Sequence, residues 1–342
     1  MHSNLSHLSY RPAFDGLRAI AIGLVMIFHA RTPWLPGGNL GVDIFFVLSG
    51  YLVTHILLSE YQHTRSLVIQ RFYKRRFWRL LPPLLILVIL YLCLAPLLWP
   101  DYYFHVRDGL GIFLYLTDIA IVLGSWPHYL VHGWSLGIEE RFYLLLPLLF
   151  ITALKYVRLA YLWRFFLAIA LLDTLWRWGW LLNYNETMYY RFDLRLSGLF
   201  LGAAVACLPI QTLERLRSVK PWMLSMIGSA VLYALFIEHG QVARLAVGVP
   251  IIEIATALLL IHLQLTPDSE VSHKLSNRYL IYTGKISYGL YLFHYPIMMY
   301  CSKLFSWPVT LFLGSILTFV MAGLSWRYIE HPINKWRKQR YA

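Results

Sequence analysis

Residues 80–98 read LLPPLLILVILYLCLAPLL, a run without a single charged side chain. At 1.5 Å per residue, a helix of this length matches the hydrocarbon core of a bilayer, which is about 30 Å thick. The whole chain of 342 residues is 58% hydrophobic and 14% charged, with a mean hydropathy of +0.56. That composition gives a water-soluble fold too little polar surface. The sequence therefore predicts an integral membrane protein with one domain over residues 1–342.

Eleven apolar segments of this kind follow one another along the chain, at residues 17–32, 39–58, 80–98, 109–124, 134–154, 165–182, 194–210, 222–237, 245–264, 286–304 and 309–328. Short loops rich in Lys and Arg stay in the cytoplasm, and all the basic clusters fall on that side only if ten segments cross. The segment to remove is 109–124, which is short, carries Asp118 and ends in a Gly-Ser-Trp-Pro break at 124–127. We expect an all-α polytopic fold with about ten transmembrane helices, this segment re-entrant or interfacial, and both termini in the cytoplasm.

The formal net charge of +13 does not indicate a nucleic-acid-binding protein. The Lys and Arg residues lie in short clusters between the apolar segments and form no continuous basic face, so the lipid bilayer is the expected partner. The three cysteines, Cys93, Cys207 and Cys301, are widely spaced within or beside apolar segments. This spacing gives neither a disulfide framework nor a metal-ligand pattern. We therefore expect packing cysteines and no metal cofactor.

Arg18 and His29 are eleven residues apart in the first apolar segment. In a helix their levels differ by roughly 16 Å, which puts Arg18 at the cytoplasmic surface and His29 in the outer third of the membrane. An ionisable group inside a span is costly unless it is paired or hydrated, so His29 is a candidate catalytic residue. A second interpretation stays open, in which Arg18 is a surface anchor and His29 a hydrogen-bonded packing residue.

Two adjacent carboxylates, Glu139 and Glu140, lie inside another apolar segment. With ten crossings this segment starts on the outer side, so we expect the carboxylates at the depth of His29. There, one of them would orient the imidazole and let His29 act as a general base. The alternative is that the two carboxylates form structural salt bridges with Arg141 or Arg191.

Five further residues near the outer ends of the segments are candidates for substrate binding: Asp43, Trp134, Ser135, Asp193 and Arg195. Their aromatic and paired polar groups suit stacking and hydrogen bonding to sugars. An ordinary aromatic belt at the membrane surface has the same composition, and Asp43 alone also fits an interfacial residue.

The basic run at residues 71–79 contains Arg76 and Arg79 in an R-x-x-R pattern, and Lys285 lies at the same predicted inner surface. Guanidinium groups bind phosphate in a bidentate geometry, so these residues are candidates for holding a phosphorylated cytoplasmic ligand. Anionic lipid headgroups would attract the same run. His294, ten residues before Leu304, lies near the middle of its segment, where packing is the expected role.

Five sequence features occur in this order along nearly the whole chain: the Arg18 to His29 spacing, Gly-Val-Asp-Ile-Phe-Phe-Val-Leu-Ser-Gly-Tyr at 41–51, the Arg76 and Arg79 pair, Trp-Ser-Leu-x-x-Glu-Glu at 134–140, and Lys-Ile-Ser-Tyr-x-Leu-Tyr-Leu-x-His-x-Pro at 285–296. Together they resemble the membrane acyltransferase-3 family, the O-acetylase group that decorates bacterial envelope polysaccharides. Arg141 departs from the pattern, because the family usually has Gln after the paired glutamates.

The resemblance implies a ten-helix bundle in the bacterial cytoplasmic (inner) membrane. It also implies an acyl-CoA donor, acetyl-CoA above all, that binds from the cytoplasm at Arg18, Arg76 and Arg79. His29 would be central to acyl delivery, and the acceptor would be a hydroxyl group of an envelope carbohydrate or glycolipid on the outer side. Because the sequence ends at residue 342 without a hydrolase-like domain, we expect the membrane domain or a partner to engage the acceptor.

A different class of function also fits the composition. A proton-coupled secondary transporter of an anionic solute would use the buried carboxylates and histidines to relay protons. A receptor or scaffold without turnover would leave the deep charged groups unexplained.

Overall fold

The computed structural model describes residues 11–98, 102–125, 127–216, 221–236 and 240–340, and within these ranges every regular element is a helix. The predicted cytoplasmic termini, and residue 237 of the predicted segment 222–237, lie outside the described residues. The α-helices are α1 (Pro12–His29), α2 (Gly41–Thr64), α3 (Ile69–Leu98), α4 (Tyr102–Phe113), α5 (Thr117–Val122), α6 (Gly133–Tyr156), α7 (Leu162–Trp180), α8 (Ser197–Ala206), α9 (Ile210–Leu216), α10 (Pro221–Phe236), α11 (Gln241–Ala243), α12 (Val249–Leu265), α13 (Glu270–Leu275), α14 (Arg278–Lys285), α15 (Ser287–Leu304), α16 (Trp307–Ser325) and α17 (His331–Arg340).

Among the described residues, six helical stretches are long and apolar enough to cross a membrane: Pro12–His29, Gly38–Thr64, Ile69–Leu98, Leu159–Asn183, Gln241–Leu265 and Trp307–Arg337. The chain is therefore an all-α, multi-pass membrane protein. The count of about ten crossings is not confirmed and stays a prediction. Four of the segments it needs are not among these six, namely those in α6, α8, α10 and α15. Helix α6 carries adjacent charged side chains, and α8 and α10 span only 10 and 16 residues.

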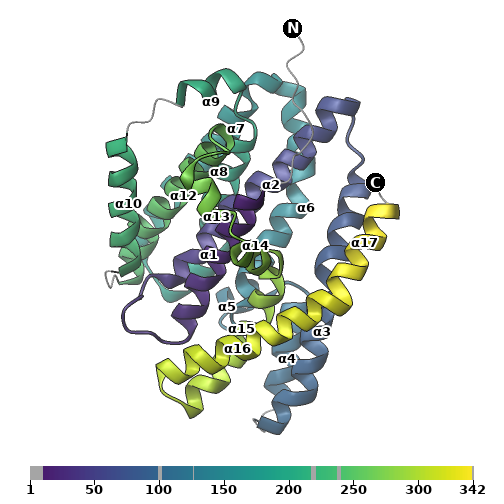
Figure 1. The fold of residues 1–342 in the computed structure, drawn as a ribbon, viewed down its shortest axis with the longest axis vertical. Helices are drawn as coiled ribbons and strands as arrows, with labels where there is room; N and C mark the ends of the chain where they lie inside the picture. Colours follow the sequence, from purple (N-terminus) through teal and green to yellow (C-terminus); the bar gives the residue numbers. More distant parts are fainter. Residues whose placement is uncertain (1–10, 99–101, 126, 217–220, 237–239, 341–342) are drawn as a thin grey trace.

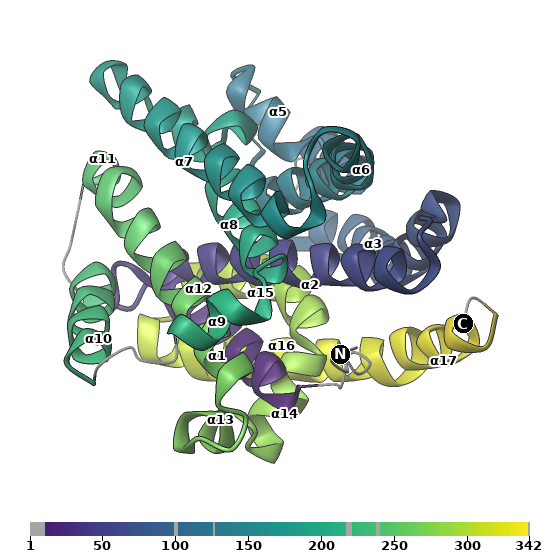
Figure 2. The ribbon, with the colours of Figure 1, turned by 90° about the horizontal axis from the view of Figure 1, so that it is seen from above.

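The central pair α1 and α2 runs through the middle of the molecule, with α10 and α12 on one side and α3, α4 and α17 on the other (Figure 1). Seen from above, α6 and α7 lie on one side of this pair and α13 and α14 on the opposite side (Figure 2). Side chains from α1, α2, α3, α6 and α15 line one common cavity, which is described below.

Close contact between α2 and α8 depends on two glycines. A Cβ atom on Gly50 would lie 1.9 Å from the carbonyl oxygen of Leu199, and one on Gly202 would lie 2.0 Å from that of Val47. Only glycine fits at such distances, and small residues of this kind let membrane helices approach backbone to backbone. Gly50 therefore serves helix packing, and the neighbouring Ser49 lies on the interior side of α2.

The segment predicted to be re-entrant or interfacial, 109–124, is not one helix. It breaks at Tyr115, whose φ of +57° is in the left-handed region, and continues as the short helix α5. Arg141 on α6 holds this second half, because it forms an ion pair with Asp118 and donates a hydrogen bond to the Tyr115 carbonyl oxygen at 3.3 Å.

Helix α16 continues through a π-helical turn, Trp326–Glu330, into α17, which lies along the start of α3. The rings of Trp78 and Trp336 are 5.2 Å apart, and Arg337 donates a hydrogen bond to the Arg75 carbonyl oxygen at 2.7 Å. Two basic clusters that are far apart in the sequence, at 71–79 and 335–340, therefore lie together.

Candidate active site

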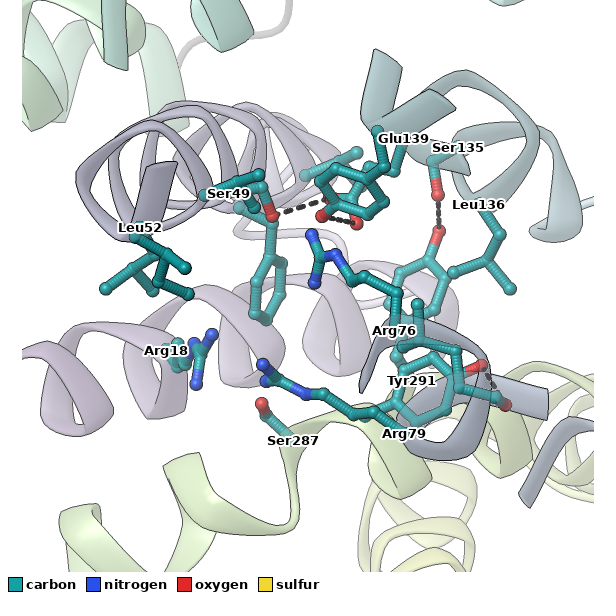
Figure 3. A pocket seen from close by; sticks show the side chains of 17 residues that line it. Arg18, Ser49, Leu52, Arg76, Arg79, Ser135, Leu136, Glu139, Ser287 and Tyr291 are labelled. Atoms are coloured by element: carbon teal, nitrogen blue, oxygen red, sulfur yellow. Dashed lines mark hydrogen bonds between the residues drawn. The ribbon is translucent and has the colours of Figure 1, made fainter. Parts of the chain in front are cut away.

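A partly open cavity with an interior volume of about 100 Å³ lies among α1, α2, α3, α6 and α15. Its walls are formed by Arg18, Val42, Phe45, Ser49, Leu52, Val53, Ile56, Arg76, Arg79, Leu80, Ser135, Leu136, Glu139, Tyr143, Ser287, Tyr288 and Tyr291. The guanidinium groups of Arg18, Arg76 and Arg79 all point into it (Figure 3). We call it the arginine cavity.

The three arginines reach the cavity from two helices. Arg76 and Arg79 are three residues apart on α3, a spacing that places side chains on the same face of a helix. The Arg76 guanidinium lies 3.4 Å from the ring centroid of Tyr143, and its Nη2 has no hydrogen-bond partner among the described residues. Arg18 forms an ion pair with Asp15 at 3.5 Å. Such a group of forked donors is suited to bind phosphate.

Glu139 is the carboxylate that lines this cavity. It accepts hydrogen bonds from the Ser49 hydroxyl at 3.1 Å and from the Tyr143 hydroxyl at 2.8 Å. The next residue, Glu140, interacts electrostatically with Arg76. Glu139 therefore holds α2 and α6 together and offsets part of the positive charge of the arginines.

The predicted contact between His29 and Glu139 or Glu140 is wrong. Within the described part of the chain, His29 makes hydrogen-bonding contacts only with Val25 and His294. The cause is an error in depth, because the residue of this region at the level of His29 is His132, which immediately precedes α6 and packs near His294. Glu139 is seven residues further along and thus roughly 10 Å deeper.

The salt bridges considered for the two glutamates are also wrong, because both arginines have aspartate partners. Arg141 pairs with Asp118, and Arg191 pairs with Asp193 at 2.6 Å.

His29, His132 and His294 form a second polar group, which we call the histidine cluster. Nδ1 of His29 is 3.2 Å from Nε2 of His294, and the rings of His132 and His294 are 5.5 Å apart. The ring of Tyr295 stacks on His132 at 4.9 Å and lies edge-on to His29 at 5.0 Å. His294, for which the sequence suggests only packing, is fully buried and touches His29.

His132 was missed as a candidate, although its position at the outer start of an apolar segment marks the level of His29. Its Nε2 lies 3.2 Å from the carbonyl oxygen of Leu292. That oxygen is free because its helical partner would be the N–H of Pro296, and proline has none. The proline in α15 thus creates the acceptor that binds His132.

Ser135 and Tyr291 separate the arginine cavity from the histidine cluster. Both line the cavity, and their hydroxyl oxygens are 2.5 Å apart (Figure 3). The backbone oxygen of His132 accepts hydrogen bonds from the Tyr291 hydroxyl at 3.0 Å and from the Ser135 hydroxyl at 3.5 Å, and between the two hydroxyls either oxygen can be the donor.

Asp43 and Arg195, predicted as separate binding residues, form one fully buried ion pair with a distance of 2.8 Å. The Arg195 guanidinium lies 4.7 Å from the ring centroid of Tyr189 and 5.4 Å from that of Trp134. Among the described residues, Oδ2 of Asp43 and Nε and Nη1 of Arg195 have no hydrogen-bond partner. The pair is therefore tightly packed but keeps unused hydrogen-bonding capacity.

The profile of a family described as an acyltransferase domain matches residues 11–327. The chain belongs to the acyltransferase-3 family. It is 34% identical over 347 residues to the O-acetyltransferase OatA of Staphylococcus aureus (strain NCTC 8325 / PS 47), and the alignment covers 95% of this chain and 57% of that protein. It is 31% identical over 353 residues to the peptidoglycan O-acetyltransferase OatA of Listeria monocytogenes serovar 1/2a, and this alignment covers 95% of this chain and 56% of that protein. No solved structure matches the chain.

The chain of this acyltransferase-3 member spans somewhat more than half the length of these curated relatives. Two further candidate residues, Asp193 and Lys285, lie away from the arginine cavity and the histidine cluster. Asp193 is partly exposed, pairs with Arg191 and accepts a hydrogen bond from the Trp176 indole at 3.0 Å. Lys285, at the end of α14, is exposed and does not line the arginine cavity.

The described residues of this acyltransferase-3 chain contain no group of three or more His, Cys, Asp or Glu side chains arranged to hold a metal ion.

Proposed function

We propose that this acyltransferase-3 member moves an acetyl group from cytoplasmic acetyl-CoA to a hydroxyl group of an envelope carbohydrate or glycolipid on the outer side of a bacterial cytoplasmic membrane. The observation that carries the proposal is the arginine cavity, because it gathers three guanidinium groups and because one of them, that of Arg18, is on the same helix as His29. The names of the relatives support it, since both are O-acetyltransferases and one acts on peptidoglycan.

The phosphates of coenzyme A bind Arg18, Arg76 and Arg79 in this proposal. The cavity walls carry three positive charges and one negative charge, that of Glu139, and the remaining excess favours a phosphorylated ligand. Arg18 and His29 differ by roughly 16 Å along α1, which is of the order of the length of a pantetheine arm. The exposed Lys285 is a candidate for contact with donor atoms that project from the cavity.

His29 acts as the general base for the acceptor hydroxyl. Its ring takes the hydroxyl proton, the acceptor oxygen bonds to the thioester carbon, and the bond from that carbon to sulfur breaks. The departing sulfur then takes the proton, so that the products are an acetyl ester and free coenzyme A. Glu139 and Glu140 support this reaction from the donor side, where they position Ser49, Tyr143 and Arg76.

The acceptor side is proposed at the outer residues Asp43, Trp134, Ser135, Asp193 and Arg195. Asp193 is the accessible member, and the nearby indole of Trp176 offers a surface for a sugar ring. Asp43 and Arg195 are fully buried, so in this proposal they act by holding the rings of Trp134 and Tyr189 in place.

We expect Arg79→Gln to raise the KM for acetyl-CoA by about 10- to 100-fold, because a hydrogen bond to a charged group contributes about 1.5 to 3 kcal/mol. With S-acetylpantetheine, which lacks the phosphates near the nucleotide, the variant and the wild type should have similar KM values. Coenzyme A or pantetheine release, followed with a thiol reagent, measures both. Arg327→Gln, at an exposed arginine outside the cavity, is the matched control. An equal rise in KM for both donors would contradict the phosphate-binding role.

Purified protein in liposomes distinguishes this function from proton-coupled transport. Acetyl-CoA is supplied on one side of the membrane and a soluble peptidoglycan oligosaccharide on the other. Release of coenzyme A together with an acetylated oligosaccharide supports the enzyme. Solute uptake into the vesicles without any release of coenzyme A would favour the transporter.

A further inference from the structure

The hydrogen bonds of the histidine cluster determine which ring nitrogen of each histidine carries a proton. A backbone carbonyl oxygen only accepts hydrogen bonds, so a neutral imidazole that faces one presents its N–H to it. Nδ1 of His294 lies 2.7 Å from the carbonyl oxygen of Tyr291. His294 is therefore protonated at Nδ1, and its Nε2 carries a lone pair.

That lone pair faces His29. Nδ1 of His29 lies 3.2 Å from Nε2 of His294 and 3.0 Å from the carbonyl oxygen of Val25. Both neighbours are acceptors, so the His29 proton belongs on Nδ1, where the two acceptors share it. Nε2 of His29 is then the unprotonated nitrogen.

The opposite tautomer of His29 would be costly in this environment. Its Nδ1 lone pair would face two other acceptors, and both Nε2 of His294 and the Val25 oxygen would lose a donor. His294 is fully buried, so water does not replace the lost hydrogen bond. An unpaired buried acceptor is destabilising.

His132 does not share this task. Its Nε2 faces the carbonyl oxygen of Leu292, which leaves its Nδ1 without a partner among the described residues. Its ring packs against Tyr295 and His294 and makes no hydrogen bond to His29.

From these contacts we infer that His294 is a positioning residue that holds His29 in the tautomer with a bare Nε2. This is the nitrogen that takes the proton of the acceptor hydroxyl, a step that rests on the proposed function. When Nε2 becomes protonated, Nε2 of His294 still accepts from the His29 Nδ1–H and stabilises the imidazolium inside a site shielded from water.

The tautomer is tested directly by nitrogen NMR on protein labelled with ¹⁵N in its histidine rings, where protonated and bare nitrogens have well-separated shifts. The His29 signals are assigned by their loss in His29→Gln. We expect a neutral His29 ring with a protonated Nδ1 and a bare Nε2 in the wild type. A wild-type His29 ring protonated at Nε2 would overturn the inference, whatever the activity of the protein.

Two substitutions of His294 test its effect on the reaction. His294→Leu keeps a buried side chain but removes the acceptor, and we expect it to lower kcat by about 100-fold while the KM for acetyl-CoA stays within about threefold. His294→Gln places an amide oxygen near the former Nε2 and should recover kcat to within about tenfold of the wild type. His262→Gln, on α12 and outside the cluster, should leave kcat unchanged.

Coenzyme A release with a soluble peptidoglycan oligosaccharide as acceptor gives these rates. A folded His294→Leu protein with wild-type kcat and an unchanged His29 spectrum would overturn the positioning role. If the wild type does not transfer acetyl groups at all, the proposed function is wrong, whereas the wild-type spectrum still tests the tautomer. Should His294→Leu fail to fold, the wild-type spectrum and the Gln variant decide the question.

Discussion

His29→Gln is expected to lower acetyl transfer by about 10³-fold, because glutamine has no basic nitrogen to take a proton from the acceptor. The fold and the affinity for acetyl-CoA should change little, since His29 lies outside the arginine cavity and, among the described residues, contacts Val25, His294 and the neighbouring rings. Mass spectrometry of the acceptor measures the transfer, and titration with acetyl-CoA measures binding.

The control for this experiment is His262→Gln, which changes a histidine on α12 that contacts Thr266. It should transfer acetyl groups at the wild-type rate. A folded His29→Gln protein with wild-type turnover would remove His29 from the mechanism and, with it, the general-base step.

Asp43→Leu should destabilise the protein by about 3 to 5 kcal/mol, because it leaves the fully buried Arg195 guanidinium without its partner. The double variant Asp43→Leu with Arg195→Met should recover most of this loss, since neither partner is then left as an unpaired charge at this position. Thermal denaturation in detergent, followed by size-exclusion chromatography, compares the three proteins.

Asp193→Leu serves as the matched control, because Asp193 belongs to a partly exposed pair with Arg191. A change of less than about 1 kcal/mol is expected there. If Asp43→Leu and the double variant lose the same stability, the damage comes from packing around Asp43, and the charge of Arg195 is not its cause.

The class of fold follows from hydropathy alone, because a bilayer requires long apolar helices. The number of crossings does not follow as simply. The segments that become α6 and α8 are apolar in sequence, but α6 carries Glu139, Glu140 and Arg141 side by side, and α8 is only ten residues long. Their location relative to the membrane depends on the tertiary packing around them.

The arginine cavity is the part of the site that the sequence predicted best. Arg76 and Arg79 are close in sequence, and the helical period places them on one face of α3. Arg18 joins them only through packing of α1 against its neighbours, yet the family resemblance had already grouped the three residues. The structure brings all three to one cavity.

The contact partner of His29 could not be predicted from the sequence. Residue numbers give the depth of a side chain in the membrane only to within about two helical turns. An error of that size places Glu139 at the level of His29, where the structure has His132. The contact with His294 joins residues 265 positions apart. Likewise, the Asp43 and Arg195 pair joins α2 to the bend that precedes α8, and only the folded chain brings these two segments together.

The hydrogen bond between Ser135 and Tyr291 also matters for the bilayer itself. In the proposed function, the thioester comes from one side of the membrane and the alcohol from the other, so the path between them could also conduct protons and small ions. The two hydroxyl groups are 2.5 Å apart, and the Tyr291 hydroxyl is bound to the backbone oxygen of His132, so the pair links the arginine cavity to the histidine cluster. We therefore expect the hydrogen bond between Ser135 and Tyr291 to limit ion leakage when no donor is bound. It should break only when the narrow, uncharged end of the thioester arm passes between the two side chains.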